Sequence, residues 1–168
     1  IRRLQADCDR RKTKFSKNWI KDKQKVAKLK NRQKRARNEL HHEITHAITE
    51  KFGKIAVEDL NIKGMTASAE GTEEEPGSMV KQKSGLNRAI LERGWANFVG
   101  QLEYKSQWKG GEVVKVDPQY TSQMCSVCGH VASESRETQS KFECVKCGHQ
   151  ENADVNAAKN ILSKMKEV

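Results

Sequence analysis

The sequence has few aromatic residues, two prolines and no long apolar run. Phe, Trp and Tyr together make up 5% of its 168 residues. No stretch approaches the ~18 to 20 apolar residues of a membrane-spanning helix, and the amino-terminal residues lack the apolar segment of a secretory signal. These absences argue against a membrane protein and against a signal-bearing secreted protein. The first residue is Ile1 and not Met, so a missing amino-terminal piece has to be considered.

Acidic residues are scarce in the first third of the chain. Residues 1–51 hold 17 Lys and Arg against 6 Asp and Glu, whereas residues 52–168 hold 15 and 16. Between Arg10 and Arg37 there are 14 basic residues, opposed only by Asp22. A merely solvated helix face usually alternates Glu with Lys, and Glu is nearly absent here. We therefore predict contacts to nucleic-acid phosphates, which release counterions. The predicted contact residues are Lys21, Lys25, Lys28, Arg32 and Arg35.

Hydrophobic periodicity predicts an α/β fold, because helical and strand patterns alternate along the chain. Glycine and proline mark the ends of most of the expected elements. The expected order is a helix over Asn18–Lys51, a strand over Ile55–Val57, an exposed loop over 63–85, a helix over Leu86–Trp108, a strand over Glu112–Val116 and a last helix over Ala153–Met165. Asn152 is the expected amino-terminal cap of the last helix.

Four of the five cysteines fall into two Cys-x-x-Cys pairs, which is metal-binding spacing. The ligands are Cys125, Cys128, Cys144 and Cys147. Four thiolates close a tetrahedral site with no open position for water, so we predict a zinc ribbon with a structural Zn²⁺. His130 and His149 are then not ligands. The fifth cysteine, Cys8, is interpreted as a bystander.

Two carboxylates stand at positions suited to catalysis. Glu58 ends the first expected strand, where side chains of an α/β sheet reach the ligand crevice. Asp154 lies in the first turn of the last expected helix. Each also has a simple explanation: a strand-end acid is often only solvated, and an acid in a first helical turn favours the helix dipole. Asp59 is the alternative to Glu58, but strand alternation turns adjacent side chains to opposite faces, so only one can serve.

Several motifs occur together in an order that resembles one known family. They are Lys83-Ser84-Gly85-Leu86-Asn87-Arg88, Ile55 to Asn61, Asp117 to Gln123, the cysteine ribbon, and Asn152-Ala153-Asp154-Val155-Asn156-Ala157-Ala158-Lys159-Asn160-Ile161. Over essentially its whole length the chain is similar to the TnpB (OrfB) proteins of IS200/IS605-type insertion sequences and to the related miniature type V CRISPR effectors.

This resemblance implies a RuvC-like nuclease domain of the RNase H-like fold, with the four-cysteine zinc ribbon inserted before its last helix. In that family three acids hold two Mg²⁺ ions. By motif, Glu58 is the second acid and Asp154 the third. The first, in a Gly-x-Asp-x-Gly setting, is absent from the chain and is expected upstream of residue 1. A supporting acid often found two residues before the third is replaced by Asn152.

The implied organisation is a basic helical segment over 1–51, the RuvC-like core over 52–120, the ribbon over 121–150 and the last helix over 151–168. The implied function is that of the carboxy-terminal portion of a Mg²⁺-dependent, RNA-guided DNA endonuclease. Its partners would be guide RNA and target DNA, with no membrane and no small-molecule substrate, in the cytoplasm near the nucleoid. The 168-residue chain alone is expected to be inactive, because the first acid is missing.

Two other functions remain open at this point. One is a nuclease-inactive, nucleic-acid-binding remnant or repressor of the same family, which the absent first acid allows. The other is a zinc-ribbon RNA-binding or structural module, which would leave Glu58 and Asp154 unexplained. The sequence does not specify the guide RNA or the DNA strand that the ribbon would contact.

Overall fold

The computed structural model describes residues 1–11 and 13–166. Residue 12, part of the predicted basic stretch, and residues 167–168, part of the predicted last segment, lie outside these ranges. The chain divides into two compact units, Ile1–Ala47 and Ile48–Val168. None of the described helices combines the length and the apolar character needed to cross a membrane.

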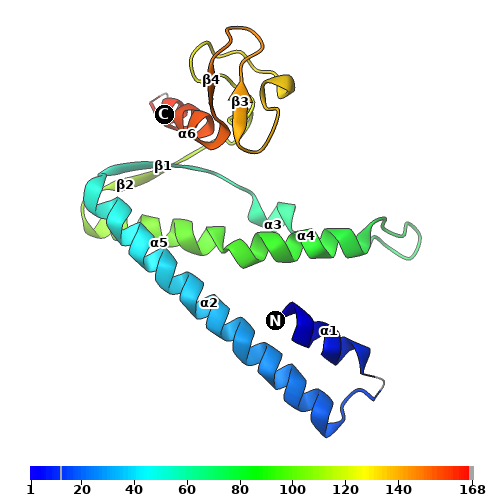
Figure 1. The fold of residues 1–168 in the computed structure, drawn as a ribbon. Coiled ribbons are helices and arrows are strands. Elements are labelled where there is room, and N and C mark those ends of the chain that lie inside the picture. The colour runs from blue at the N-terminus through cyan, green and yellow to red at the C-terminus, as the bar shows by residue number, and fades with distance from the viewer. Residues whose placement is uncertain (12, 167–168) are drawn as a thin grey trace. The chain divides into compact units, whose positions relative to one another are not determined.

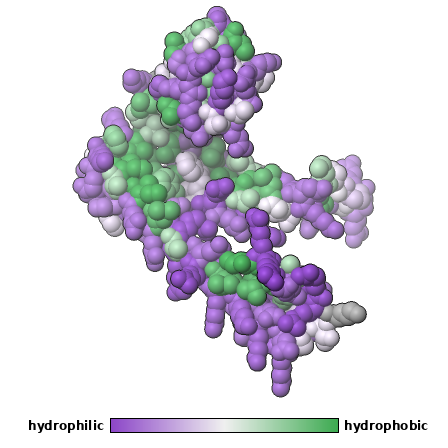
Figure 2. Space-filling model, viewed as in Figure 1, coloured by the Kyte–Doolittle hydropathy of each residue, from purple (hydrophilic) through white to green (hydrophobic). Residues whose placement is uncertain are grey.

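The first unit is a pair of helices. Helix α1 spans Arg2–Arg10, and α2 spans Lys17–Lys51, so its last turn belongs to the second unit. Ion pairs join the pair of helices: Arg11 with Asp22 at 2.7 Å and Lys23 with Asp9 at 3.3 Å. Cys8 is fully buried in this unit. The long helix predicted from Asn18 is confirmed, and the view in Figure 2 shows mostly hydrophilic surface over these helices.

The second unit contains a parallel two-stranded sheet (Figure 1). Strand β1 (Lys54–Glu58) pairs with β2 (Glu112–Val116) in a register that places Lys54 opposite Glu112 and Glu58 opposite Val116. Alternation along β1 turns Ile55 and Val57 to one face, where they join a core with residues of α5 (Trp95–Trp108). Both strands are therefore as the sequence predicted, with β1 one residue longer at each end.

Helix α6 (Ala153–Met165) packs on both strands of this sheet. Met165 lines a cavity together with Lys54 and Val114, which alternate to the face opposite Val57. The predicted bounds of this helix and its Asn152 cap are confirmed. The Asn152 side chain accepts hydrogen bonds from the backbone N–H groups of Asp154 at 2.9 Å and Val155 at 3.2 Å.

The segment between the strands departs from the sequence prediction in three places. Helix α3 (Ile62–Met65) precedes a loop, and α4 (Val80–Arg93) begins six residues before the predicted Leu86. Gly85 is tolerated inside α4 because Asn87 Nδ2 donates to Thr66 O at 2.9 Å, which holds α4 to the preceding segment. The predicted single helix is also divided, because Gly94 has a φ of 70° and separates α4 from α5.

The cysteine segment forms a small module with little regular structure. It contains a 3-10 turn η1 (Ser133–Ser135) and an antiparallel pair of short strands, β3 (Lys141–Glu143) and β4 (Gln150–Asn152). Phe142 is fully buried, and it forms a core with Cys125, Cys144 and Ala153. The module thus folds around two of its cysteines and the first residue of α6.

Candidate metal centre and catalytic acids

The four paired cysteines converge on one point. Their sulfur atoms all lie within 4.8 Å of one another, and they are the only metal-binding group of three or more His, Cys, Asp or Glu found among the described residues. Cys125 Sγ lies 3.7 Å from Cys147 Sγ, and Cys128 Sγ lies 3.6 Å from Cys144 Sγ. A tetrahedral ion with metal–sulfur bonds of ~2.3 Å requires sulfur–sulfur distances of ~3.8 Å. The cluster therefore fits one tetrahedral metal ion.

The two halves of the centre share one backbone design. Gly129 N–H donates to Cys125 O, and Cys125 N–H donates to His130 O, both at 2.9 Å. The second half repeats these bonds at 2.9 Å around Cys144, with Gly148 and His149 in the matching positions. Gly129 and Gly148 have φ values of 70° and 71°, which explains a glycine after the second cysteine of each pair.

The protonation of the thiols depends on this backbone. The backbone N–H of Cys147, followed by that of Lys146, lowers the pKa of the Cys144 thiol to about 6, against the effect of burial. For Cys147 the backbone N–H of His149 acts in the same direction. There, however, the hydrogen bonds with Cys128, Cys144 and Cys125, together with burial, prevail and raise the pKa of Cys147 to about 12. In the metal-free cluster Cys144 is therefore the residue that becomes a thiolate most readily, and it accepts hydrogen bonds from the Cys147 and Cys128 thiols.

Two asparagines of α6 attach the helix to the cysteine module, and the sequence analysis gave them no role. Asn156 is fully buried; its Oδ1 accepts from Ser126 N–H at 2.9 Å and its Nδ2 donates to Met124 O at 2.8 Å. Asn160 donates to Thr121 O at 2.9 Å and to Met124 O at 2.7 Å. Their spacing of four residues was visible in the sequence, but their backbone partners were not.

Glu58 ends β1 on the face of the sheet that α6 covers, since alternation places it opposite to Val57. The Oγ1 of Thr121 donates to Glu58 Oε1 at 2.6 Å. Thr121 is buried, and its carbonyl is held by Asn160 of α6. The Glu58 carboxylate is therefore positioned by a residue that α6 itself fixes, an interaction that sequence reasoning missed.

Asp154 lies in the first turn of α6 with its side chain 84% exposed. Its ion-pair partner is Arg136 of the cysteine module, at 3.7 Å. Among the described residues, no hydrogen bond or ion pair joins Asp154 to Glu58. The two predicted acids thus stand on adjoining elements, each with a partner of its own.

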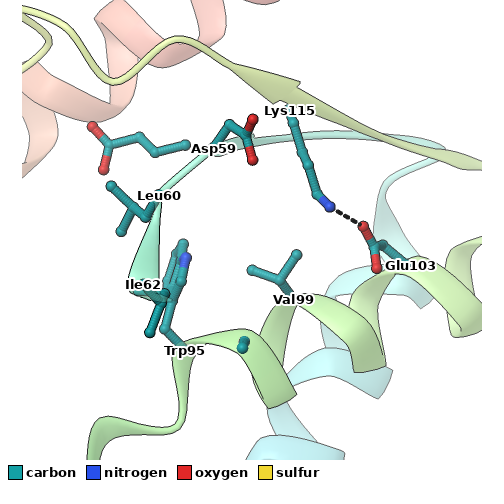
Figure 3. Close-up of a pocket in the computed structure, with 9 residues that line it drawn as sticks. Asp59, Leu60, Ile62, Trp95, Val99, Glu103 and Lys115 are labelled. Atoms are coloured by element: carbon teal, nitrogen blue, oxygen red, sulfur yellow. Dashed lines mark ion pairs between the residues drawn. The ribbon is translucent and has the colours of Figure 1, made fainter. Parts of the chain in front are cut away.

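A pocket of about 150 Å³ adjoins the carboxyl end of β1 (Figure 3). Glu58, Asp59, Leu60 and Trp95 are among the residues that line it, and Lys115 pairs across its rim with Glu103 at 2.8 Å. The hydrogen bond and the charge of Glu103 raise the pKa of Lys115, and the negative charge of Asp59 adds to this effect. Asp59 therefore lies near Lys115 on the α5 side, and Glu58 borders the same pocket.

The five basic residues predicted to contact nucleic acid all lie on α2 and are exposed. Their spacings of four and three residues place them on one stripe of the helix. No ion pair with the described residues neutralises them. They are Lys21, Lys25, Lys28, Arg32 and Arg35.

Comparison with known proteins gives two family models that match different parts of the chain. Residues 1–69 match the family OrfB_IS605, described as "Probable transposase". Residues 95–161 match the family described as "Cas12f1-like, TNB domain". The two descriptions define the class of protein: the chain is related both to transposon-encoded proteins and to CRISPR effectors.

The chain is 47% identical over 97% of its length to InsQ of Escherichia coli (strain K12), whose name is that of a putative RNA-guided DNA endonuclease. It is 53% identical over 61 residues to the CRISPR-associated endodeoxyribonuclease Cas12f1 of Sulfoacidibacillus thermotolerans. It spans 40% of InsQ and 14% of that Cas12f1. The chain belongs to the TnpB (OrfB) family.

Solved structures agree with this membership. A Cas12f1–sgRNA–target DNA complex matches with a TM-score of 0.61 and 26% identity, covering 92% of this chain and 40% of the solved chain. A CRISPR–Cas12f ternary complex also matches with a TM-score of 0.61. The identity is 27%, and the match covers 95% of this chain and 30% of the solved chain. The predicted α/β class and the predicted family are therefore confirmed.

Proposed function

We propose that the chain is the carboxy-terminal part of an RNA-guided DNA endonuclease with a RuvC-like nuclease centre of the RNase H-like fold. Its partners are a guide RNA and a target DNA, as the names of its relatives describe for those proteins. The observation that carries the proposal is the link from Glu58 through Thr121 to Asn160, which ties a strand-end carboxylate to the helix that bears Asp154.

The four cysteines hold a structural zinc ion in this proposal. The sulfur–sulfur distances of 3.6 and 3.7 Å fit tetrahedral thiolate coordination, and four thiolates leave no position for a reacting water. Zinc then contributes its binding energy to the folding of the module, including the position of Arg136 beside Asp154.

Glu58 and Asp154 serve as carboxylate ligands of Mg²⁺, which prefers oxygen donors. When bound, two such ions activate water and stabilise the leaving oxygen of a phosphodiester. Glu58 contributes an oriented carboxylate, because Thr121 fixes one of its oxygens at 2.6 Å. Asp154 would contribute an exposed carboxylate, which in this structure pairs with Arg136. Two carboxylates supply two negative charges against the four positive charges of two ions, so a third acid is required.

The test compares the 168-residue chain with the same chain extended by the in-frame sequence upstream of residue 1. We expect guide-dependent cleavage of DNA with Mg²⁺ only in the extended protein. Glu58→Gln and Asp154→Asn should each abolish cleavage and leave guide and target binding nearly intact, because they keep shape and remove charge. Asp59→Asn is the matched control and should keep most of the activity. Cleavage that survives Asp154→Asn contradicts the proposed site.

The exposed stripe of α2 holds a nucleic-acid backbone in this proposal. Replacing Lys21, Lys25, Lys28 and Arg32 with Gln should reduce the salt dependence of binding, with a slope change of about 0.9 for each duplex phosphate that is no longer neutralised. Replacing Lys63, Lys81, Arg88 and Arg93, which are also exposed, is the matched control and should change the slope less. Binding that does not vary between about 50 and 200 mM salt contradicts the role.

A second candidate function is that of a nuclease-inactive, nucleic-acid-binding protein of the same family. The observation that favours it is the ion pair of Asp154 with Arg136, whose guanidinium competes with a metal ion for this carboxylate. Under this alternative, the extended protein binds guide and target but does not cut. Under this alternative, Arg136→Gln leaves the extended protein unable to cut DNA. If the protein is an active nuclease, Arg136→Gln keeps cleavage and retains or raises the metal affinity, because the competing guanidinium is gone.

A further inference from the structure

A second charged and aromatic surface lies at the opposite end of the sheet from Glu58. It combines the last turn of α2, the carboxyl end of α5 and the first residues of β1 and β2, which meet at one side of the second unit (Figure 1). Lys109 Nζ joins α5 to α2 by an ion pair with Glu50 and by a hydrogen bond to Thr49 Oγ1 at 3.3 Å. Four steps of ~3.3 Å along β1 separate this end from Glu58.

Trp108 is the most exposed large apolar side chain among the described residues, with 79% of its surface open. Its ring packs edge-on against Tyr104, with centroids 4.8 Å apart, so it is braced in place. Phe52, at the end of α2, is 57% exposed. A fixed, open indole face is suited to stacking against a flat ligand group.

Positive charge lies directly beside this ring. At 100° per residue, Lys105 and Lys109 occupy the part of the α5 surface between Trp108 and Ser106. Burial and the neighbouring charge of Lys109 lower the pKa of Lys105, as expected for cations that lie close together. Lys51 adds a third positive charge at the end of α2, and Glu50, the ion-pair partner of Lys109, is the acidic residue that lines the cavity.

A cavity of about 330 Å³ opens next to these lysines. Lys51, Ser106, Lys109 and Gly111 are among the residues that line it. Ser106 Oγ is buried, with 2% of the residue exposed, and has no hydrogen-bond partner among the described residues. A buried hydroxyl without a partner is costly, and a bound acceptor would satisfy it. Lysine ammonium groups and a hydroxyl are donors that match a phosphate oxygen.

We propose that this surface binds single-stranded nucleic acid, with a base stacked on Trp108 and a backbone phosphate in the cavity near Ser106, Lys51 and Lys109. A single strand is the occupant because its bases expose their faces, whereas those of a duplex are covered by their neighbours. The surface lies away from Glu58, so it is a holding point outside the proposed cleavage site. Its binding does not depend on metal-dependent cleavage, and the two proposals can fail separately.

The first test measures binding of the 168-residue chain to labelled oligo(dT) of about 12 nucleotides and to a duplex of equal length. Trp108→Ala should weaken oligo(dT) binding about five-fold or more, and Trp108→Phe should retain most of it, because a phenyl ring still stacks. Leu91→Ala, at an exposed apolar residue of α4, is the control and should have no effect. Duplex affinity should change less than about two-fold in all of them.

The second test locates the contact, since the basic stripe of α2 also binds nucleic acid. Oligo(dT) carrying 5-iodouracil is cross-linked by ultraviolet light, and the modified peptide is identified by mass spectrometry. We expect a cross-link at Trp108. Lys51→Gln should reduce the salt slope of single-strand binding by about 0.7, and Lys54→Gln, on the neighbouring strand, should not. Cross-links confined to other residues, or unchanged binding by Trp108→Ala, overturn the proposal.

Discussion

The cysteine centre and the acid pair represent opposite kinds of site within one unit. The centre is closed: its four sulfurs lie within 4.8 Å of one another, and matching backbone bonds surround each half. The acid pair is open: Asp154 is 84% exposed and Glu58 depends on a hydroxyl from another segment. The closed site is built from short local spacings, whereas the open site depends on the packing of α6 against the sheet.

The largest expected effect is the loss of the metal centre. Cys144→Ser removes one of four ligands and a buried side chain, so zinc binding and the fold of the module should fail together. Elemental analysis after dialysis should give one zinc for the unaltered chain and close to none for the variant. Cys8→Ser changes a buried cysteine outside the cluster and should keep the zinc. A Cys144→Ser chain with full zinc and an unchanged Tm contradicts the site.

The second largest effect is expected from a change that breaks the connection between α6 and the cysteine module. Asn156→Ala leaves the Ser126 N–H without its partner and leaves Met124 O only the bond from Asn160, which costs about 1 to 3 kcal/mol of unfolding free energy. Denaturant unfolding followed by circular dichroism measures it. Ser163→Ala, on the exposed side of the same helix, should stay within about 0.5 kcal/mol. Equal effects of the two changes would mean that the asparagine is not a structural tie.

Below about pH 6, zinc binding should have to displace one more proton, that of the Cys144 thiol. Above pH 6 the Cys144 thiol, with its pKa lowered to about 6, is already a thiolate, so metal binding does not have to displace its proton. As the pH falls through about 6, that proton must be displaced, and the slope of log zinc affinity against pH should steepen by about one. Competition with a chromogenic chelator at several pH values measures this. A constant slope across this range contradicts the lowered pKa.

The smallest expected effect is at the acid pair. Thr121→Val keeps the shape of the side chain and removes the 2.6 Å hydrogen bond to Glu58, so stability should fall by only about 1 kcal/mol. In the extended protein the same change should reduce cleavage while leaving nucleic-acid binding unchanged. Thr138→Val, at an exposed turn of the cysteine module, is the control. Undiminished cleavage by Thr121→Val would mean that Glu58 does not need this positioning.

The sequence predicted the closed site and both strands well, because their signals are local. It could not predict the roles of Thr121, Asn156 and Asn160, since their partners are distant, and two of the three act only on backbone atoms that carry no residue signature. The early start of α4 was missed because Gly85 was interpreted as a helix breaker, whereas tertiary bonds hold the helix there. The break at Gly94 was missed because the apolar period continues across it.

The positions of the four thiols also determine how the module would respond to oxidants. The shortest sulfur–sulfur distances, 3.6 and 3.7 Å, join one Cys-x-x-Cys pair to the other. Thiolate attack requires access to the partner sulfur, and Cys144, with its low pKa, lies next to Cys128. Oxidation of the metal-free chain should therefore form disulfides between the two halves of the module. Such cross-links would retain its outline while removing every ligand for zinc, leaving a protein that is compact but no longer able to recover its metal until it is reduced.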